Sequence, residues 1–252
     1  MPTDSIDLHV LILIALAGFY AGAQNVLAGG GSFITFPALL LAGINPLAAN
    51  MTSTIALFPS QVTAAIAGRD LIGGVPNLSF KKLFVISVVG GVLGALLLLN
   101  TPVAVFVQLV PWLVLFATAV FAWGSFRPKP LHAVDHMSAP ILVTAQGAIA
   151  IYGGYFGGGI GFLMLAALTI AGQKVRMATA TKNALAMAMN ASAVLIFVFS
   201  PLVNWPAALA LGAGGVFGGL SGSWLLHRLP EKVLRGFIVA VGSALTVWLF
   251  LR

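Results

Sequence analysis

Long apolar segments separated by short polar turns dominate the pattern of this chain. A run of about 20 apolar residues is long enough to cross a bilayer as a helix. The long segments are Leu8–Ala28, Leu47–Gly68, Leu83–Leu99, Val103–Trp123, Ala139–Tyr152, Met177–Phe199, Trp205–Leu226 and Val233–Leu251. Two shorter apolar pieces, Ser32–Ala42 and Phe162–Ala171, each follow a glycine-rich stretch. The pattern predicts an all-α polytopic membrane protein, in which Trp112, in the middle of a segment, packs between helices.

Composition strengthens this prediction. Of 252 residues, 60% are hydrophobic and 7% are charged, whereas soluble domains carry about 25% charged residues. A soluble enzyme, a secreted disulfide scaffold and a disordered chain are therefore excluded, and the absence of cysteine removes disulfide and thiolate chemistry. The net charge of +7 comes from cations in short loops, which is typical of membrane topology and predicts no nucleic-acid partner.

The two halves of the chain resemble each other. A shift of 129 residues gives nine identities in the 24 positions from Gly29 to Thr52, where composition alone would give roughly two or three. The shared membrane composition is the alternative explanation. The duplication predicts a first transmembrane repeat at 1–126, a cytoplasmic linker at 127–138 and a second transmembrane repeat at 139–252.

The positions of the cations predict opposite orientations for the two repeats. If each short apolar piece turns the chain back, the cations of Arg69–Lys82, Lys174–Arg176 and Arg228–Arg235 all face the cytoplasm. The loops on the other face then carry no Lys or Arg, with Arg252 at the chain end as the exception. Four simple crossings in each half would instead separate these cations. We therefore expect an inverted repeat in the cell inner membrane, with the N-terminus outside the cytoplasm.

Two glycine-rich breaks, Gly29–Gly31 and Gly157–Gly159, indicate a binding site. Irregular backbone at membrane depth is tolerated where it is buried in protein or lines a cavity, and the helix N-terminus after it attracts anions. Close helix packing is the alternative, and it is what we expect of Gly90–Gly91 and Gly218–Gly219. The candidate substrate-binding residues are Asn25, Gly30, Gly31, Ser32, Thr52, Ser53, Gln61, Gly158, Gly159, Thr181, Lys182, Asn183 and Asn190.

Apart from Arg235, the third residue of the last segment, Lys182 is the only cation within an apolar segment. Its side chain either extends to the nearby membrane surface or attracts an anionic substrate, and the sequence leaves both open. Gln61 and Asn190 are separated by the same 129 residues, and they either join helices or contact substrate.

Catalytic and metal chemistry are not expected. No apolar segment contains Asp or Glu, which disfavours acid–base catalysis, divalent-cation transport and direct proton coupling through a carboxylate. His132, Asp135 and His136 have a spacing that could hold a metal, but their proline-rich surroundings favour a solvated loop. We expect no enzyme activity, no metal and no cofactor.

The paired motifs resemble the sulfite exporter TauE/SafE family. Gly29-Gly30-Gly31-Ser32 with Pro37, Gly43 and Ala49-x2-Thr52-Ser53 looks like the first family signature, and Gly157-Gly158-Gly159 with Gly172 and Ala178-x-Ala180-Thr181 resembles the second copy. The second copy departs in having Lys182, where the family often has Ser, and in lacking a proline that matches Pro37.

This resemblance implies export of small sulfur-containing anions such as sulfite, sulfoacetate or related organosulfonates. The expected partners are a small anionic substrate and the lipid bilayer, and a homo-oligomer stays open. A transporter of a different small solute and a non-transporting membrane scaffold subunit are the alternatives.

Overall fold

The computed structural model describes residues 7–27, 31–76, 78–126, 138–226 and 231–251. Its regular elements are α1 (Leu8–Leu27), α2 (Ser32–Leu41), α3 (Pro46–Ala67), the short 3₁₀ turn η1 (Arg69–Leu71), α4 (Phe80–Leu99), α5 (Val103–Phe126), α6 (Ala139–Tyr155), α7 (Ile160–Ile170), α8 (Val175–Phe197), α9 (Trp205–Leu226) and α10 (Glu231–Leu251). Apart from an isolated bridge between Val75 and Leu78, the described residues form helices and turns. The predicted all-α class is confirmed.

The two halves contain the same order of helices. In each, a long helix is followed by a short one and then by three long ones, as α1–α5 and as α6–α10. Two residues after the end of each short helix stands a glycine with left-handed backbone, Gly43 (φ +81°) or Gly172 (φ +99°). Each of these glycines donates its N–H to a carbonyl three residues earlier, and the left-handed conformation costs glycine little. The sequence similarity between the halves therefore extends to the helix order and to the ends of the short helices.

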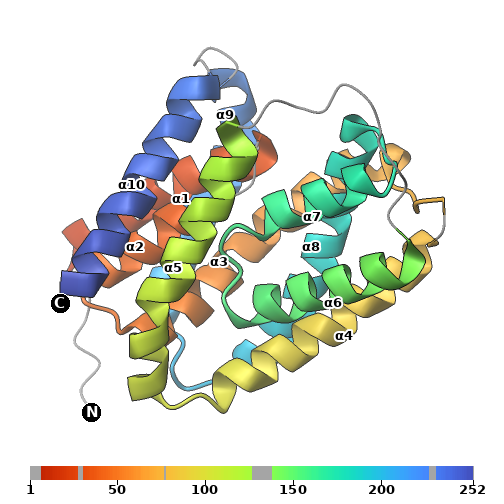
Figure 1. The fold of residues 1–252 in the computed structure, drawn as a ribbon. Coiled ribbons are helices and arrows are strands. Elements are labelled where there is room, and N and C mark those ends of the chain that lie inside the picture. The colour runs from red at the N-terminus through yellow and green to blue at the C-terminus, as the bar shows by residue number, and fades with distance from the viewer. Residues whose placement is uncertain (1–6, 28–30, 77, 127–137, 227–230, 252) are drawn as a thin grey trace.

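Each half packs its first helix against the fourth helix of the other half. Helix α1 lies along α9, and α6 lies along α4, as Figure 1 shows for the α4–α6 pair. Helices α3 and α8 pack together in the middle of the molecule. Gly68, at the end of α3, lies beside Ala180 near the start of α8, whereas Gln61 meets Asn190 further along. These two contacts show that α3 and α8 run in opposite directions.

Glycines allow the first and fourth helices to approach closely. A Cβ atom added to Gly22 of α1 would overlap the backbone of Gly215 in α9, and one added to Gly218 would overlap Phe19. Gly90 and Gly91 of α4 stand against Ala150 and Met189 in the same way. The prediction that Gly90, Gly91 and Gly218 serve helix packing is confirmed.

We expect Gly22→Val to lower the stability of the protein by about 3 kcal/mol, because the helix backbones must separate to admit the side chain. The matched control is Gly236→Val on α10, where an added Cβ meets no atom within 4 Å. Thermal unfolding in detergent measures both variants. Equal unfolding midpoints for the two would contradict the proposed role of Gly22.

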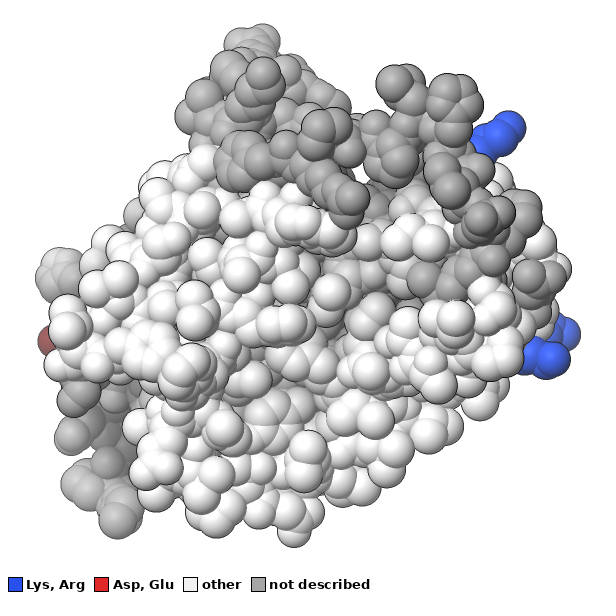
Figure 2. All heavy atoms as spheres, in the orientation of Figure 1, with Lys and Arg blue, Asp and Glu red and all other residues white. Residues whose placement is uncertain are grey.

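The described cations near the α3–α4 and α7–α8 turns lie at one end of the molecule. Gln173, in the α7–α8 turn, donates hydrogen bonds from Nε2 to the carbonyls of Gly73 (2.7 Å) and Gly74 (3.0 Å). These bonds bring Arg69 of the α3–α4 loop, and Lys81 and Lys82 in the first turn of α4, to the end of the molecule that carries Lys174 and Arg176. In Figure 2 the blue atoms lie at one edge, and the rest of the described surface of this face is almost wholly uncharged.

The described helices suit a lipid environment. Three contain apolar windows long enough to cross a membrane, Leu8–Asn25, Phe80–Leu99 and Val103–Ser125, in the part of the chain that the structure covers. Large apolar side chains point outward from these helices, as expected of a surface that faces lipid. Trp112 is among them at 62% exposed, with its ring edge-to-face on Phe250. The expectation that Trp112 packs between helices is wrong, because its position on α5 faces outward.

Candidate functional site

A cavity of about 90 Å³ lies where the break between α6 and α7 meets α3, α8 and the residues Asn25 and Ser32 on either side of the first break. Its polar side chains come from Asn25, Ser32, Asn50, Ser53, Thr54, Gln61, Lys182, Asn183 and Asn190. Its apolar wall is formed mainly by Phe33, Phe36, Leu57, Val114, Phe156 and Leu245. The cavity thus combines one positive charge, several amides and hydroxyls, and an aromatic wall.

Helices α3 and α8 each turn one polar face to this cavity. On α3 the lining residues Asn50, Ser53, Thr54 and Gln61 follow helical spacing, and on α8 the lining positions run from Lys182 to Asn190 with the same period. Asn190 Nδ2 donates to Gln61 Oε1 at 2.8 Å, so this pair joins the two helices at the cavity. Both of the roles considered for Gln61 and Asn190 are compatible with this placement.

The break between α6 and α7 forms one side of the cavity. Residues Phe156 to Gly161 line it, and Gly157 (φ +79°) and Gly159 (φ +75°) hold left-handed backbone that other residues adopt at a cost. Helix α7 starts at Ile160 without a side-chain cap. Its N-terminal N–H groups and positive dipole end therefore lie beside the cavity.

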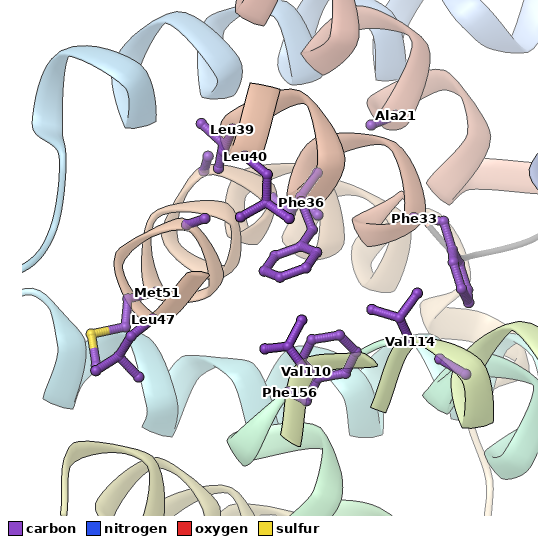
Figure 3. Close-up of a cluster of buried hydrophobic side chains, with 14 of the residues drawn as sticks. Ala21, Phe33, Phe36, Leu39, Leu40, Leu47, Met51, Val110, Val114 and Phe156 are labelled. Atoms are coloured by element: carbon purple, nitrogen blue, oxygen red, sulfur yellow. The ribbon is translucent and has the colours of Figure 1, made fainter. Parts of the chain in front are cut away.

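The side chain of Asn50 binds the backbone where this break begins. Its Nδ2 donates at 2.9 Å to the carbonyl of Tyr155, the last residue of α6. Phe156 then packs edge-to-face on Phe36 of α2, with ring centroids 5.5 Å apart. Figure 3 shows Phe36 pointing from α2 toward Phe156 and Val110, so the aromatic wall connects the two halves.

The first break is described from Gly31 onward. The Gly31 N–H donates to Asn25 Oδ1 at 2.9 Å, and Asn25 Nδ2 donates to Ser60 Oγ at 3.3 Å. Asn25 and Ser32 both line the cavity, whereas Gly31 does not. Gly30 lies outside the described residues. The Asn25 side chain thus connects the backbone of this break at Gly31 to α3.

Lys182 is the only charged side chain among the described residues that line the cavity. The residue is 6% exposed, and its Nζ lies over the start of α7, 3.6 Å from where a Cβ of Gly161 would be. Within the described part of the chain it forms no hydrogen bond or ion pair. Of the two alternatives for Lys182, extension to the membrane surface is not what the structure shows.

Several predicted site residues meet at the cavity, and others do not. Those that line it are Asn25, Ser32, Ser53, Gln61, Gly158, Gly159, Lys182, Asn183 and Asn190. Gly31, Thr52 and Thr181 do not. Asn50 and Thr54 line the cavity but were not predicted, although Asn50 shares a helix face with Ser53 and that spacing could have identified it.

Thr52 and Thr181 each form a hydrogen bond with the backbone of a loop in the other half, and the two bonds are equivalent. Thr52 Oγ1 accepts from the N–H of Asn204 at 3.1 Å, and Thr181 Oγ1 accepts from the N–H of Gly73 at 3.2 Å. Each threonine therefore fixes the loop that follows the third helix of the other half. These hydrogen bonds occupy both hydroxyls away from the cavity.

We expect Thr181→Val to lower stability by about 1–3 kcal/mol, because it leaves the partly buried N–H of Gly73 without its acceptor and removes one of the two donors to the Gly73 carbonyl. Thr179→Val is the control, since Thr179 Oγ1 donates only to Val175 of its own helix. Thermal unfolding separates the two variants. A Thr181→Val protein as stable as the control, but altered in ligand binding, would assign Thr181 to the cavity after all.

Metal binding finds no support in the described residues, which contain no group of three His, Cys, Asp or Glu side chains. His132, Asp135 and His136 lie outside the described residues.

Comparison with known proteins extends over nearly the whole chain. The family model "Sulfite exporter TauE/SafE" matches residues 14–249. The chain is 33% identical over 245 residues to the "Probable membrane transporter protein ORF9" of Sinorhizobium sp, covering 95% of this chain and 92% of that protein. It is 31% identical to the "Probable membrane transporter protein YfcA" of Escherichia coli K12, covering 95% and 88%. A "Probable membrane transporter protein" of Haemophilus influenzae is 25% identical, covering 96% and 94%. No solved structure matches the chain.

Proposed function

The chain belongs to the sulfite exporter TauE/SafE family of membrane transporters, and from this premise we propose that it exports small sulfur-containing anions from the cytoplasm. Sulfite, sulfoacetate and related organosulfonates are the substrates proposed. They bind in the cavity between the two chain breaks. The proposed location is the inner membrane, with the N-terminus outside the cytoplasm.

The observation that carries the proposal is the unpartnered ammonium of Lys182 in the cavity. A buried charge without a partner is costly in a low-dielectric interior, and an anion offsets that cost. The N-terminus of α7 adds positive potential on the same side. Both features favour a negatively charged substrate over a cation or a neutral solute.

The size of the cavity supports a small substrate. An engineered cavity of about 150 Å³ in another protein holds benzene, so a cavity of about 90 Å³ suits a solute with fewer heavy atoms. Sulfite and methanesulfonate meet this limit. Sulfoacetate is larger than benzene and requires the cavity to widen. The polar lining argues against a purely structural membrane subunit.

The contacts between the halves support an inverted repeat. If each helix is replaced by its equivalent in the other half, the packed pair of α1 and α9 becomes the packed pair of α6 and α4. The packed pair of α3 and α8 becomes itself. Because α3 and α8 are antiparallel, a two-fold axis that exchanges them is perpendicular to both. If both helices cross the membrane, that axis lies in the membrane plane, and the two halves have opposite orientations.

Labelling of single cysteines tests this topology, and the chain offers a background without cysteine. We expect Lys81→Cys, Lys174→Cys and Lys232→Cys to react with a membrane-impermeant maleimide only after cells are permeabilised. Ser200→Cys, in a turn without Lys or Arg, should react in intact cells. Opposite accessibility of Lys81→Cys and Lys174→Cys would contradict the inverted arrangement.

Flux through proteoliposomes tests the proposed function. Vesicles are loaded with sulfite, methanesulfonate, sulfoacetate, taurine, sulfate or thiosulfate, and efflux is compared with that from protein-free vesicles. We expect the sulfur anions to leave faster than the zwitterion taurine. Flux of none of these anions, in protein that is folded and inserted, would contradict the proposal and favour a different solute or a scaffold role.

A further inference from the structure

We infer that the cavity selects singly charged anions, because its one ammonium group balances one negative charge and no more. This inference rests on the proposed function and narrows its substrate class to hydrogen sulfite and simple sulfonates, whereas sulfoacetate, a dianion at neutral pH, is disfavoured. It predicts that a monoanionic sulfonate is preferred over a dianion of the same size and shape.

The charge count follows from the described lining of the cavity. Lys182 supplies one positive charge, and the remaining described lining residues are amides, hydroxyls, glycines and apolar side chains. Around a bound monoanion the pair is neutral. A dianion leaves a net negative charge in a buried, low-dielectric site, where uncompensated charge is costly.

Hydrogen-bond donors around the cavity do not replace a second cation. The Asn190 amide donates to Gln61 Oε1, and Ser53 Oγ lies 2.6 Å from Thr35 Oγ1. The amide of Asn50 is bonded to the Tyr155 carbonyl. Several donors are therefore already occupied, and the other side-chain donors in the described lining, such as the amide nitrogen of Gln61, carry no formal charge. Lys182 and the start of α7 are thus the main attraction for negative charge.

The repeat offers a position at which a second charge can be added. Ser53 and Lys182 are separated by 129 residues, the shift that aligns the halves, and both line the cavity. One half thus presents a hydroxyl where the other presents an ammonium. Exchanging these two residues moves the single charge to the other half, whereas Ser53→Lys alone doubles it.

Methanesulfonate and sulfate are suitable probes because they share a tetrahedral sulfur and nearly the same size but differ in charge. Binding is measured by the ligand-induced shift in thermal unfolding and by isothermal titration in detergent. We expect wild type to bind methanesulfonate at least about tenfold more tightly than sulfate, consistent with one unbalanced charge.

The variants change only the charge of the cavity and leave its apolar wall unaltered, so they test the effect of charge alone. Ser53→Lys should move the preference toward sulfate by at least about tenfold relative to wild type. Lys182→Ser should weaken binding of both anions. The double variant Ser53→Lys with Lys182→Ser should recover the preference for methanesulfonate.

Each outcome bears on one of the two claims. Wild type that binds sulfate as tightly as methanesulfonate overturns the selection of monoanions but leaves anion transport standing. A folded Ser53→Lys protein with an unchanged preference also overturns it. Binding of neither anion by wild type overturns the proposed function itself. The wild-type comparison needs no variant, so the inference stays testable if Ser53→Lys fails to fold.

Discussion

Replacement of Lys182 by Met should weaken anion binding by about 30-fold to several thousandfold. Removing one partner of a buried charge pair costs about 2–5 kcal/mol, and Lys182 is the only cation among the described lining residues of the cavity. Met has a similar length and shape but no charge. Titration of purified protein with methanesulfonate, together with efflux from proteoliposomes, measures the loss.

The same substitution should leave the ligand-free protein at least as stable as wild type. The ammonium is buried without a partner in the described structure, and apolar replacement of buried charge is often neutral or stabilising. Loss of binding with an unchanged or higher unfolding midpoint therefore distinguishes a lost contact from misfolding. Lys174→Met, at the exposed start of the same helix, is the control for net charge. Flux and affinity that survive Lys182→Met would remove Lys182 from the mechanism.

Most of the fold could be predicted from the sequence, because the helices and the chain breaks each depend on residues close together in the chain. Apolar run length predicts membrane helices, and glycine with a neighbouring short apolar piece predicts a break. Helix α2 begins at the expected residue and ends one residue before the expected segment does. Helix α7 begins two residues earlier than expected and ends one residue earlier. The arrangement of the other helices depends on pairings such as α1 with α9, whose residues are far apart in the chain. The only sequence signal for that pairing is the spacing of small residues such as Gly18 and Gly22, which allow the two helices to approach closely.

The cavity could be predicted less completely, because a polar residue within a span has two possible uses. Thr52 and Thr181 looked like substrate donors, but their hydroxyls fix backbone of the opposite half. Asn50 looked unremarkable, although it lines the cavity and supports the Tyr155 carbonyl. Only the three-dimensional pairing of the halves decides which hydroxyls and amides are already satisfied by the backbone.

The role of Lys182 also depended on packing that the sequence does not reveal. A lysine near the start of a span can extend to the membrane surface, and the sequence left this alternative open. In the structure α7 and its break lie over the side chain, so Nζ stays beside Gly161 in the interior. The direction of the lysine is therefore set by a segment of the chain about twenty residues earlier that folds back onto α8.

Gly159→Ala should reduce anion affinity by about tenfold or more and should do so without unfolding the protein. Gly159 holds φ +75° at the start of α7, a conformation that costs other residues about 1–2 kcal/mol. A Cβ there would also lie 3.2 Å from the carbonyl oxygen of Ala117. Relief of both strains shifts the start of α7, and with it the N–H groups and the wall over Lys182. Binding geometry of this kind tolerates displacements of only about 0.5 Å.

Gly43→Ala provides a matched control for this substitution. Gly43 has a similar left-handed backbone (φ +81°) at the end of α2, with open space around an added Cβ and no part in the cavity lining. Both variants should lose thermal stability through the same backbone cost, and Gly159→Ala should lose more because its Cβ also crowds the Ala117 carbonyl oxygen. Only Gly159→Ala should lose affinity for methanesulfonate in titration. Equal losses of affinity in the two variants would mean that general destabilisation, and not the geometry of the break, controls binding.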